Sequence, residues 1–239
     1  MAQPSILDAG SKTKLYTSTD SSGNRTFDLD VPANANTVVI QVGLDADATA
    51  TNIITGLTHT GLTGAVELFD IDTSADNIRA ARTGIYDVRS CGAGTLEVTA
   101  ALVGSATCVA AVVMTDGYTE SFSTFVDRVM DRGRVNMHSG NSANNIAVMI
   151  GTIDADQSTF AFAGTGVTTL FKTNASGDAF AGFAGSQATS VNNVKTMTYS
   201  NEVAGDELAA TLILFSSQPN AFGDIDPRGD IISHDIITN

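Results

Sequence analysis

Aspartates spaced two residues apart recur along the chain, and their type and spacing could bind a metal ion. Two of these pairs, Asp45/Asp47 and Asp154/Asp156, each follow a strand-like run and enclose an alanine. Alternate residues of an extended backbone place two carboxylates on one side, and carboxylate oxygens are preferred ligands of Ca²⁺. Neither pair extends into the Asp-x-Asp-x-Asp-Gly loop that makes a calcium site specific. Solvated strand ends or turns are the favoured interpretation. Calcium is the weaker alternative, and no other metal or cofactor is expected.

The remaining reactive residues do not form a catalytic pattern. His59, His138 and His234 are scattered, without a second His or Cys at ligand spacing. No Gly-x-Ser-x-Gly turn follows a strand, and no glycine-rich loop leads into a helix. A sugar-binding face would need exposed aromatic rings, but the chain has no Trp and four Tyr, of which Tyr86 and Tyr199 suit strand packing. The sequence therefore predicts a protein that is not an enzyme and has no catalytic residues.

Composition limits the partners of the chain. Its 26 acidic and 12 basic residues give a net charge of −14, which repels nucleic acid and anionic membranes. Neither a signal peptide nor an apolar run long enough to cross a membrane is expected. Without a secretion signal, Cys91 and Cys108 are predicted to be buried free thiols, and a disulfide between adjacent strands is the alternative.

A faint repeat predicts the fold. Residues 37–44 and residues 146–153 are apolar runs with a late glycine, and each is followed by Asp-Ala-Asp. The two motifs are 109 residues apart (154 minus 45), which is one sandwich domain. Short strands with period-2 alternation and turn residues between them fill both units, as in residues 95–103, where four apolar residues share one face. The prediction is an all-β fold of two tandem antiparallel β-sandwiches related by duplication, and jelly-roll and immunoglobulin-like connectivity both remain open.

One segment between the repeats favours a helix. Apolar residues at i, i+3, i+4, i+7 and i+8 form a stripe, and Gly133 can end the helix. These apolar residues are Phe122, Phe125, Val126, Val129 and Met130. The stripe must be buried, either on the two sandwiches of its own chain or on a neighbouring subunit.

The predicted organisation follows from these patterns. It comprises an N-terminal arm and first strand (1–35), a first sandwich (36–118), a helical linker (119–143), a second sandwich (144–218) and a C-terminal tail (219–239). Within the arm, residues up to 25 are expected to form a free segment or a first edge strand. Besides the helix stripe, the interface candidates are Lys12, Lys14, Ile231 and Ile232, because arms and extended tails can pair with the sheet edges of other chains.

Acidic, Gly/Ala/Thr/Ser-rich β-sandwiches in tandem, with a polar arm and no catalytic residues, resemble the small accessory virion proteins of tailed bacteriophages. The resemblance implies a capsid decoration or cement protein that binds the major capsid protein, assembles in the host cytoplasm and resides in the virion as a homo-oligomer. A tail, baseplate or fibre component with a receptor-binding sandwich is the alternative, with tail proteins as partners. A bacterial adhesion or carbohydrate-binding module is the second alternative.

Overall fold

The computed structural model describes residues 3–7, 14–18, 21–45, 53–72, 81–105, 107–127, 132–138, 144–154, 160–163, 166–174, 180–188, 194–201 and 208–217. These residues form sixteen β-strands arranged in four antiparallel sheets, and they contain no helix. The all-β fold class expected from the period-2 patterns is therefore confirmed.

The first eight strands form two sheets. A five-stranded sheet has the order β1-β8-β3-β6-β5, and we call it the first inner sheet; a three-stranded sheet, β2-β7-β4, is the first outer sheet. The strands are β1 (Lys14–Ser18), β2 (Ser21–Val31), β3 (Thr37–Asp45), β4 (Ile53–Gly61), β5 (Val66–Asp72), β6 (Ala81–Asp87), β7 (Gly94–Ser105) and β8 (Thr107–Thr115). The segment predicted as an arm or edge strand thus contains β1, which is an edge strand paired with β8.

The last eight strands form a second pair of sheets. The second inner sheet has the order β13-β14-β11-β16-β9, and the second outer sheet has the order β10-β15-β12. The strands are β9 (Tyr118–Asp127), β10 (Arg132–His138), β11 (Ile146–Asp154), β12 (Phe160–Ala163), β13 (Val167–Asn174), β14 (Phe180–Ala188), β15 (Val194–Asn201) and β16 (Leu208–Ser216). Adding eight to each strand number of the first pair of sheets reproduces the neighbours in the second pair.

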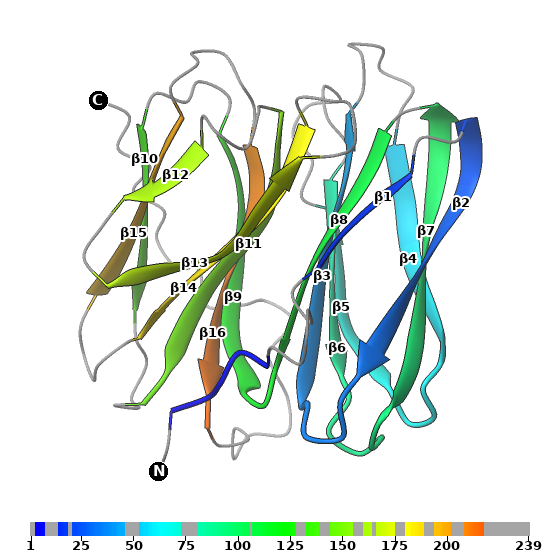
Figure 1. Cartoon of the computed structure of the whole chain (residues 1–239), viewed down its shortest axis with the longest axis horizontal. Coiled ribbons are helices and arrows are strands. Elements are labelled where there is room, and N and C mark those ends of the chain that lie inside the picture. The colour runs from blue at the N-terminus through cyan, green and yellow to red at the C-terminus, as the bar shows by residue number, and fades with distance from the viewer. Residues whose placement is uncertain are drawn as a thin grey trace.

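The four sheets stack as layers, with the two inner sheets face to face and an outer sheet on each side (Figure 1). Three apolar clusters fill the spaces between the layers. The central cluster draws on both inner sheets, with Val39, Ile85 and Val113 from the first and Val148, Ile150 and Phe215 from the second. The two halves therefore share a core of their own in addition to the core inside each half.

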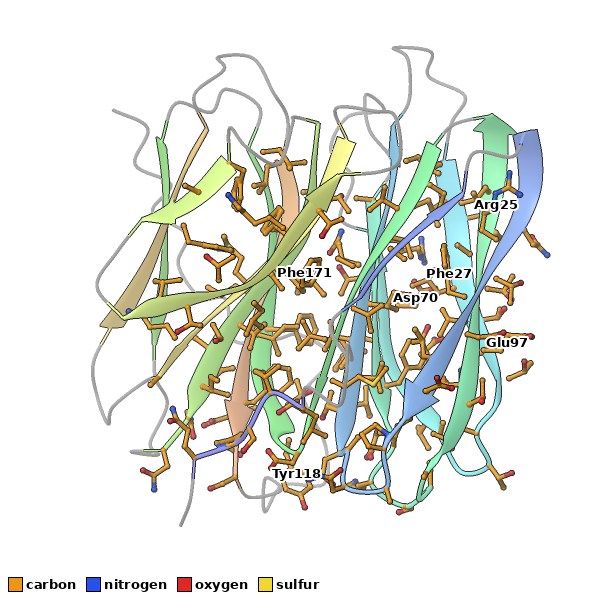
Figure 2. All side chains as sticks on the ribbon, viewed as in Figure 1. Arg25, Phe27, Asp70, Glu97, Tyr118 and Phe171 are labelled. Atoms are coloured by element: carbon orange, nitrogen blue, oxygen red, sulfur yellow. The ribbon has the colours of Figure 1, made fainter. Side chains whose placement is uncertain are left out.

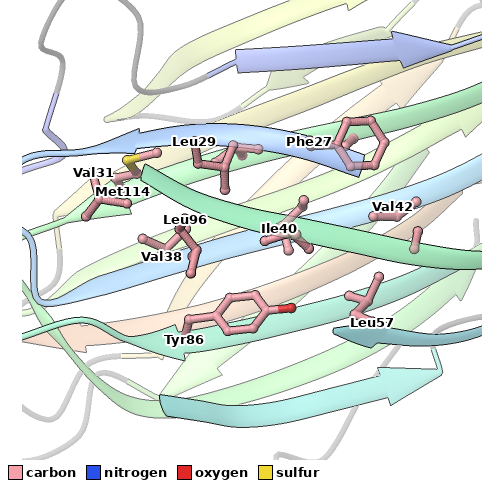
Figure 3. Close-up of a cluster of buried hydrophobic side chains, with 14 of the residues drawn as sticks. Phe27, Leu29, Val31, Val38, Ile40, Val42, Leu57, Tyr86, Leu96 and Met114 are labelled. Atoms are coloured by element: carbon pink, nitrogen blue, oxygen red, sulfur yellow. The ribbon is translucent and has the colours of Figure 1, made fainter. Parts of the chain in front are cut away.

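Alternation along the strands explains these layers. In β2, Phe27 and Leu29 are buried in the first core (Figure 3), whereas Asp28 and Asp30 are exposed on the outer face. In β3, Val38 and Ile40 pack into that same core and Val39 packs into the central one. A central strand of an inner sheet is covered on both faces, so it reads as a continuous apolar run, and all nine residues of β16 are buried.

The core of the second half depends on three phenylalanines lying over two glycines. The rings of Phe160 and Phe183 stack with centroids 4.3 Å apart, and Phe162 meets Phe183 edge-on at 5.8 Å. A Cβ added to Gly151 would lie 2.5 Å from Cζ of Phe183, and one added to Gly185 would lie 2.6 Å from the ring of Phe162. The two glycines therefore leave the space that the rings occupy.

The predicted helix in the linker is wrong. The segment forms β9, which pairs with β16, and the residues from Arg132 form β10, which pairs with β15. The 3–4 spacing of apolar residues arose within a segment rich in Thr, Phe, Tyr and Val, which favour strands, and pairing with the buried β16 supplies backbone hydrogen bonds along its length. Only Asp116 and Gly117 separate β8 from β9, so a two-residue turn carries the chain from one half to the other.

Candidate functional site

Of the calcium candidates, two lie within the described residues. Asp45 ends β3, where its backbone pairs with Thr107, and Asp154 ends β11 opposite Phe180. Asp47 and Asp156 lie outside the described residues. Within the part of the chain that the structure describes, no group of three or more His, Cys, Asp or Glu side chains could hold a metal ion.

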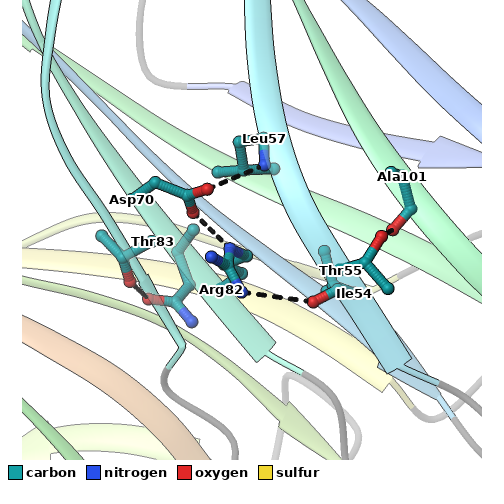
Figure 4. A network of polar contacts seen from close by, with 8 residues as sticks. Ile54, Thr55, Leu57, Asp70, Arg82, Thr83 and Ala101 are labelled. Carbon is teal, nitrogen blue, oxygen red and sulfur yellow. Dashed lines mark hydrogen bonds and ion pairs between the residues drawn. The ribbon is translucent and has the colours of Figure 1, made fainter.

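A cluster of charged residues lies where the edge strands of the first half meet. Asp70 of β5 forms an ion pair with Arg82 of β6, and both side chains are only 17% exposed. The second carboxylate oxygen of Asp70 accepts a 3.1 Å hydrogen bond from the backbone N–H of Leu57 in β4, and Arg82 donates to the carbonyl of Ile54 at 3.4 Å (Figure 4). The ion pair therefore joins the open edge of the outer sheet to the inner sheet.

Tyr86 lies beside this ion pair and is fully buried (Figure 3). Its ring covers Gly84, because a Cβ at Gly84 would lie 2.7 Å from the Tyr86 hydroxyl oxygen. The His59 ring meets it edge-on, with centroids 5.2 Å apart. Burial, assisted by Glu67 and Asp70, raises the pKa of Tyr86 far above its ordinary value, so the phenol stays protonated.

The other titratable groups of this cluster are His59 and Glu67. Nε2 of His59 lies 3.2 Å from the carbonyl oxygen of Ala65, which makes this nitrogen the donor. Burial is the largest cause of the raised pKa of Glu67, and the charge of Asp70 adds to it. His59 and Arg82 act in the opposite direction and lower this pKa. Because His59 donates to a backbone carbonyl and the carboxylate of Asp70 pairs with the guanidinium of Arg82, the cluster stabilises the contact between the two sheets of the first half.

The Tyr86 hydroxyl offers a direct test of this structural role. It has no hydrogen-bond partner among the described residues, and a buried hydroxyl without a partner costs free energy. We expect Tyr86→Phe to leave the free energy of unfolding unchanged or to raise it by about 1 kcal/mol, measured by urea denaturation. A loss of more than about 2 kcal/mol would show that the hydroxyl has a stabilising partner.

A second buried polar group joins the two inner sheets. Gln41 of β3 and Thr83 of β6 face Thr211 of β16, and all three side chains are fully buried. The hydroxyls of Thr83 and Thr211 are 2.6 Å apart, and both lie within hydrogen-bonding distance of Oε1 of Gln41. These hydrogen bonds set the alignment of the two halves, because sliding one sheet would leave the polar atoms buried without partners.

The N-terminal segment, residues 3–7, crosses the junction between the halves. Its Ser5 accepts hydrogen bonds from the backbone of Asp116 and from the hydroxyl of Thr115, and Gln3 donates to the carbonyl of Asn145 at 2.9 Å. The buried Pro4 packs at Gly117, where an added Cβ would lie 2.8 Å from the Cβ of Pro4. The segment therefore contacts both residues of the two-residue turn, Asp116 through Ser5 and Gly117 through Pro4.

The cysteines are free, as the sequence predicted: Cys108 is fully buried and Cys91 is half-buried. Burial raises the pKa of Cys108 to about 12 and also raises the pKa of Cys91, with Asp87 adding to the latter shift. The folded protein therefore holds the Cys108 proton at a pH where the unfolded chain loses it. Stability from this group falls as the pH rises from about 9 towards about 12.

We expect a thiol reagent such as DTNB to modify at most one cysteine of the native protein near pH 9, the ordinary thiol pKa, and both after denaturation. Mass spectrometry should locate the native modification at Cys91, because Cys108 is enclosed within the first core. Equal modification rates of the two thiols in the native protein would contradict this arrangement.

The structure places the predicted interface residues as follows. Phe122 packs against the central core, and its ring centroid lies 4.4 Å from that of Phe69. It therefore contacts the first half of its own chain. Lys14 begins β1 opposite Val112. Phe125 and Val126 lie in β9, paired with Ala210 and Ala209. The candidates outside the described residues are Lys12, Val129, Met130, Ile231 and Ile232.

The outer face of the first outer sheet carries threonines and carboxylates in register. One row is Thr26–Thr99–Thr58, with 3.1 Å between the hydroxyls of Thr26 and Thr99. The next row is Asp28–Glu97–Thr60, in which Thr60 donates to Glu97 at 2.8 Å. The sequence alone does not reveal this face, because the rows form only when three distant strands are paired.

Comparison with known proteins returned no match: no protein-family model fits the chain, and no curated protein or solved structure is significantly similar to it. Within the described residues there is also no helix long and apolar enough to span a membrane.

Proposed function

We propose that the chain is a non-enzymatic structural protein of a virion, of the kind that decorates or cements a capsid shell through protein contacts. The observation that carries the proposal is the strand pairing in each half. In the first half β1 pairs with β8, β2 with β7 and β3 with β6; in the second half β9 pairs with β16, β10 with β15 and β11 with β14. Such nested pairing supports jelly-roll-like connectivity, an architecture used by viral capsid and lectin domains, although β5 pairs with β6 and not with β4.

A jelly roll alone defines no activity, so the buried side chains must also be considered when the proposed functions are compared. Phe160, Phe162 and Phe183 pack together in the interior of the second half, and the Asp70 and His59 contacts of the first half join its strands and loops. Tyr86 is buried and cannot form a sugar-binding platform, which disfavours the carbohydrate-binding alternative. These contacts favour a role in assembly over one in binding a small molecule.

We further propose that the two halves arose by duplication and fusion of one sandwich that paired with itself. The strand orders correspond with a shift of eight, and β3 packs on β11 across the central core. Exchanging the halves converts the contact of β8 with β11 into the contact of β16 with β3, and both occur. Exchanged contacts of this kind are what an isologous dimer makes, although the contact of β14 with β8 has no counterpart of similar size between β6 and β16. An experimental structure whose halves failed to superpose strand for strand would contradict it.

The virion role can be tested on particles. The chain should be found by mass spectrometry in purified virions, and purified protein should cosediment with shells of the cognate major capsid protein. Labelled electron microscopy would place it on the head, whereas labelling of the tail would support the tail or baseplate alternative. A protein that neither enters particles nor binds shells would overturn the proposal.

A further inference from the structure

We propose that the polar contact among Gln41, Thr83 and Thr211 selects the partner of each inner sheet. A first inner sheet accepts a second inner sheet, of the same chain or of a second copy, and rejects its own kind. Apolar side chains fill the space between the two inner sheets, and Phe171 packs against them (Figure 2). The inference goes beyond the proposed function, because this choice of partner needs no shell and can be measured on the protein alone.

Two rows of residues, one in each inner sheet, meet at this contact. Register gives the first row as Thr83 of β6, Gln41 of β3 and Ala111 of β8. Register gives the second row as Ala184 of β14, Ile150 of β11 and Thr211 of β16. The rows occupy corresponding places, because their strand numbers differ by eight. The middle residue of each row also stands four positions before the aspartate that ends its strand (45 minus 41, and 154 minus 150).

The two rows are opposite in polarity at each of these places. Where the first row has a threonine and a glutamine, the second has an alanine and an isoleucine. Where the first row has an alanine, the second has a threonine. All of these side chains are fully buried. Each row therefore has a polar end and an apolar end, in opposite order.

In the folded chain, polar ends meet polar ends. The hydroxyls of Thr83 and Thr211 are 2.6 Å apart, and Thr211 donates to Oε1 of Gln41 at 3.1 Å. At the other end β8 lies against β11 and β14, and the three apolar residues of the rows all belong to the central core. Thr211 therefore has its hydrogen-bond partners in the opposite half of the chain.

Two like halves would not match in this way. A pair of first halves packed in the same arrangement would place Gln41 and Thr83 opposite Ala111 of the second copy, which has no hydroxyl. A pair of second halves would place the hydroxyl of Thr211 opposite Ile150 and Ala184. Burying a polar group without its partner costs more free energy than the hydrogen bond contributes. The contact therefore discriminates against like halves, as a polar residue does in other apolar interfaces.

The test moves the threonine from one row to the other in the full-length protein. Ala111→Thr combined with Thr211→Ala makes the first row complementary to itself and the second row apolar throughout, so like halves should pair between chains. Isotope-labelled and unlabelled copies are mixed, refolded from urea at high protein concentration and cross-linked at their carboxylates. Mass spectrometry then counts labelled–unlabelled peptide pairs from like halves. We expect about tenfold more of these pairs than in wild type, as for a buried polar group that loses its partner.

The two single substitutions are the matched controls. Each leaves buried polar groups without partners in both arrangements, so each should give fewer like-half pairs than the double variant. A further variant, Gln41→Leu with Thr83→Val and Thr211→Val, removes the polar groups but keeps their approximate shape. Its equilibrium constant of unfolding in urea should stay within about tenfold of wild type, and its like-half pairs should exceed those of wild type.

The proposal is overturned if the double variant or the apolar variant folds and gives no more like-half pairs than wild type. It is also overturned if the apolar variant does not fold, because the contact would then serve stability and not the choice of partner. Shell binding is not measured in this assay, so failure of this proposal and failure of the virion role are distinguishable.

Discussion

Replacing Phe215 with alanine should lower the free energy of unfolding by about 3–5 kcal/mol, the range for removing a buried aromatic ring. Phe215 is fully buried in the central core, where side chains of both inner sheets meet. The loss should appear in urea denaturation monitored by circular dichroism. Because the central core couples the halves, wild type should unfold in a single transition, and the variant should show the halves separating in calorimetry.

Val66→Ala is the control for this experiment. Val66 is 54% exposed on the edge strand β5, so its truncation should change stability by less than about 0.5 kcal/mol. If Phe215→Ala were equally mild, or if wild type already unfolded in two well-separated transitions, the central core would not be coupling the halves.

Gly151→Ala should destabilise the second half by about 1–3 kcal/mol or more, as expected for forcing atoms into a packed core. A Cβ at this position would lie 2.5 Å from Cζ of Phe183 and 2.6 Å from the carbonyl oxygen of Ala209. The second of these atoms belongs to the backbone of β16, the strand paired with β11, so it cannot move without disturbing the sheet. Thermal unfolding followed by circular dichroism would measure the loss.

Gly56→Ala is the matched substitution, because its Cβ would be 3.7 Å from the nearest atom, Oδ2 of Asp70, an ordinary contact. It should be neutral or slightly stabilising, since alanine restricts the unfolded chain more than glycine does. Equal losses at both glycines would mean that strand propensity, and not the crowding at Gly151, determines the effect.

The sequence predicted those elements whose faces differ in polarity. In β7, Leu96, Val98, Ala100 and Leu102 were expected on one buried face, and all four are buried. In β2 the exposed Asp28 alternates with buried Phe27 and Leu29 in the same way. In strands of this kind, buried and exposed residues alternate, so the local sequence is sufficient to show which face is buried.

The inner strands and the linker could not be placed in this way. A strand covered on both faces is apolar throughout, so its sequence does not reveal which partner covers which face, and the central core was not predicted. The helix prediction failed because β9 obtains its stability from pairing with β16, a contact distant in sequence that overrides local spacing. Gln41, Thr83 and Thr211 were missed for the same reason, although a polar residue inside an apolar run was the available signal.

The nested strand pairing has a consequence for synthesis of the chain. β1 pairs with β8, so the first half cannot close until residues near Thr115 have left the ribosome, and its inner face then stays uncovered until β16 is made. Long-range pairing of this kind folds slowly, and the uncovered sheet can meet the same sheet of a neighbouring nascent chain. The two-residue turn at Asp116 and Gly117 favours the correct outcome, because it keeps the second half beside the first at a high effective concentration throughout folding.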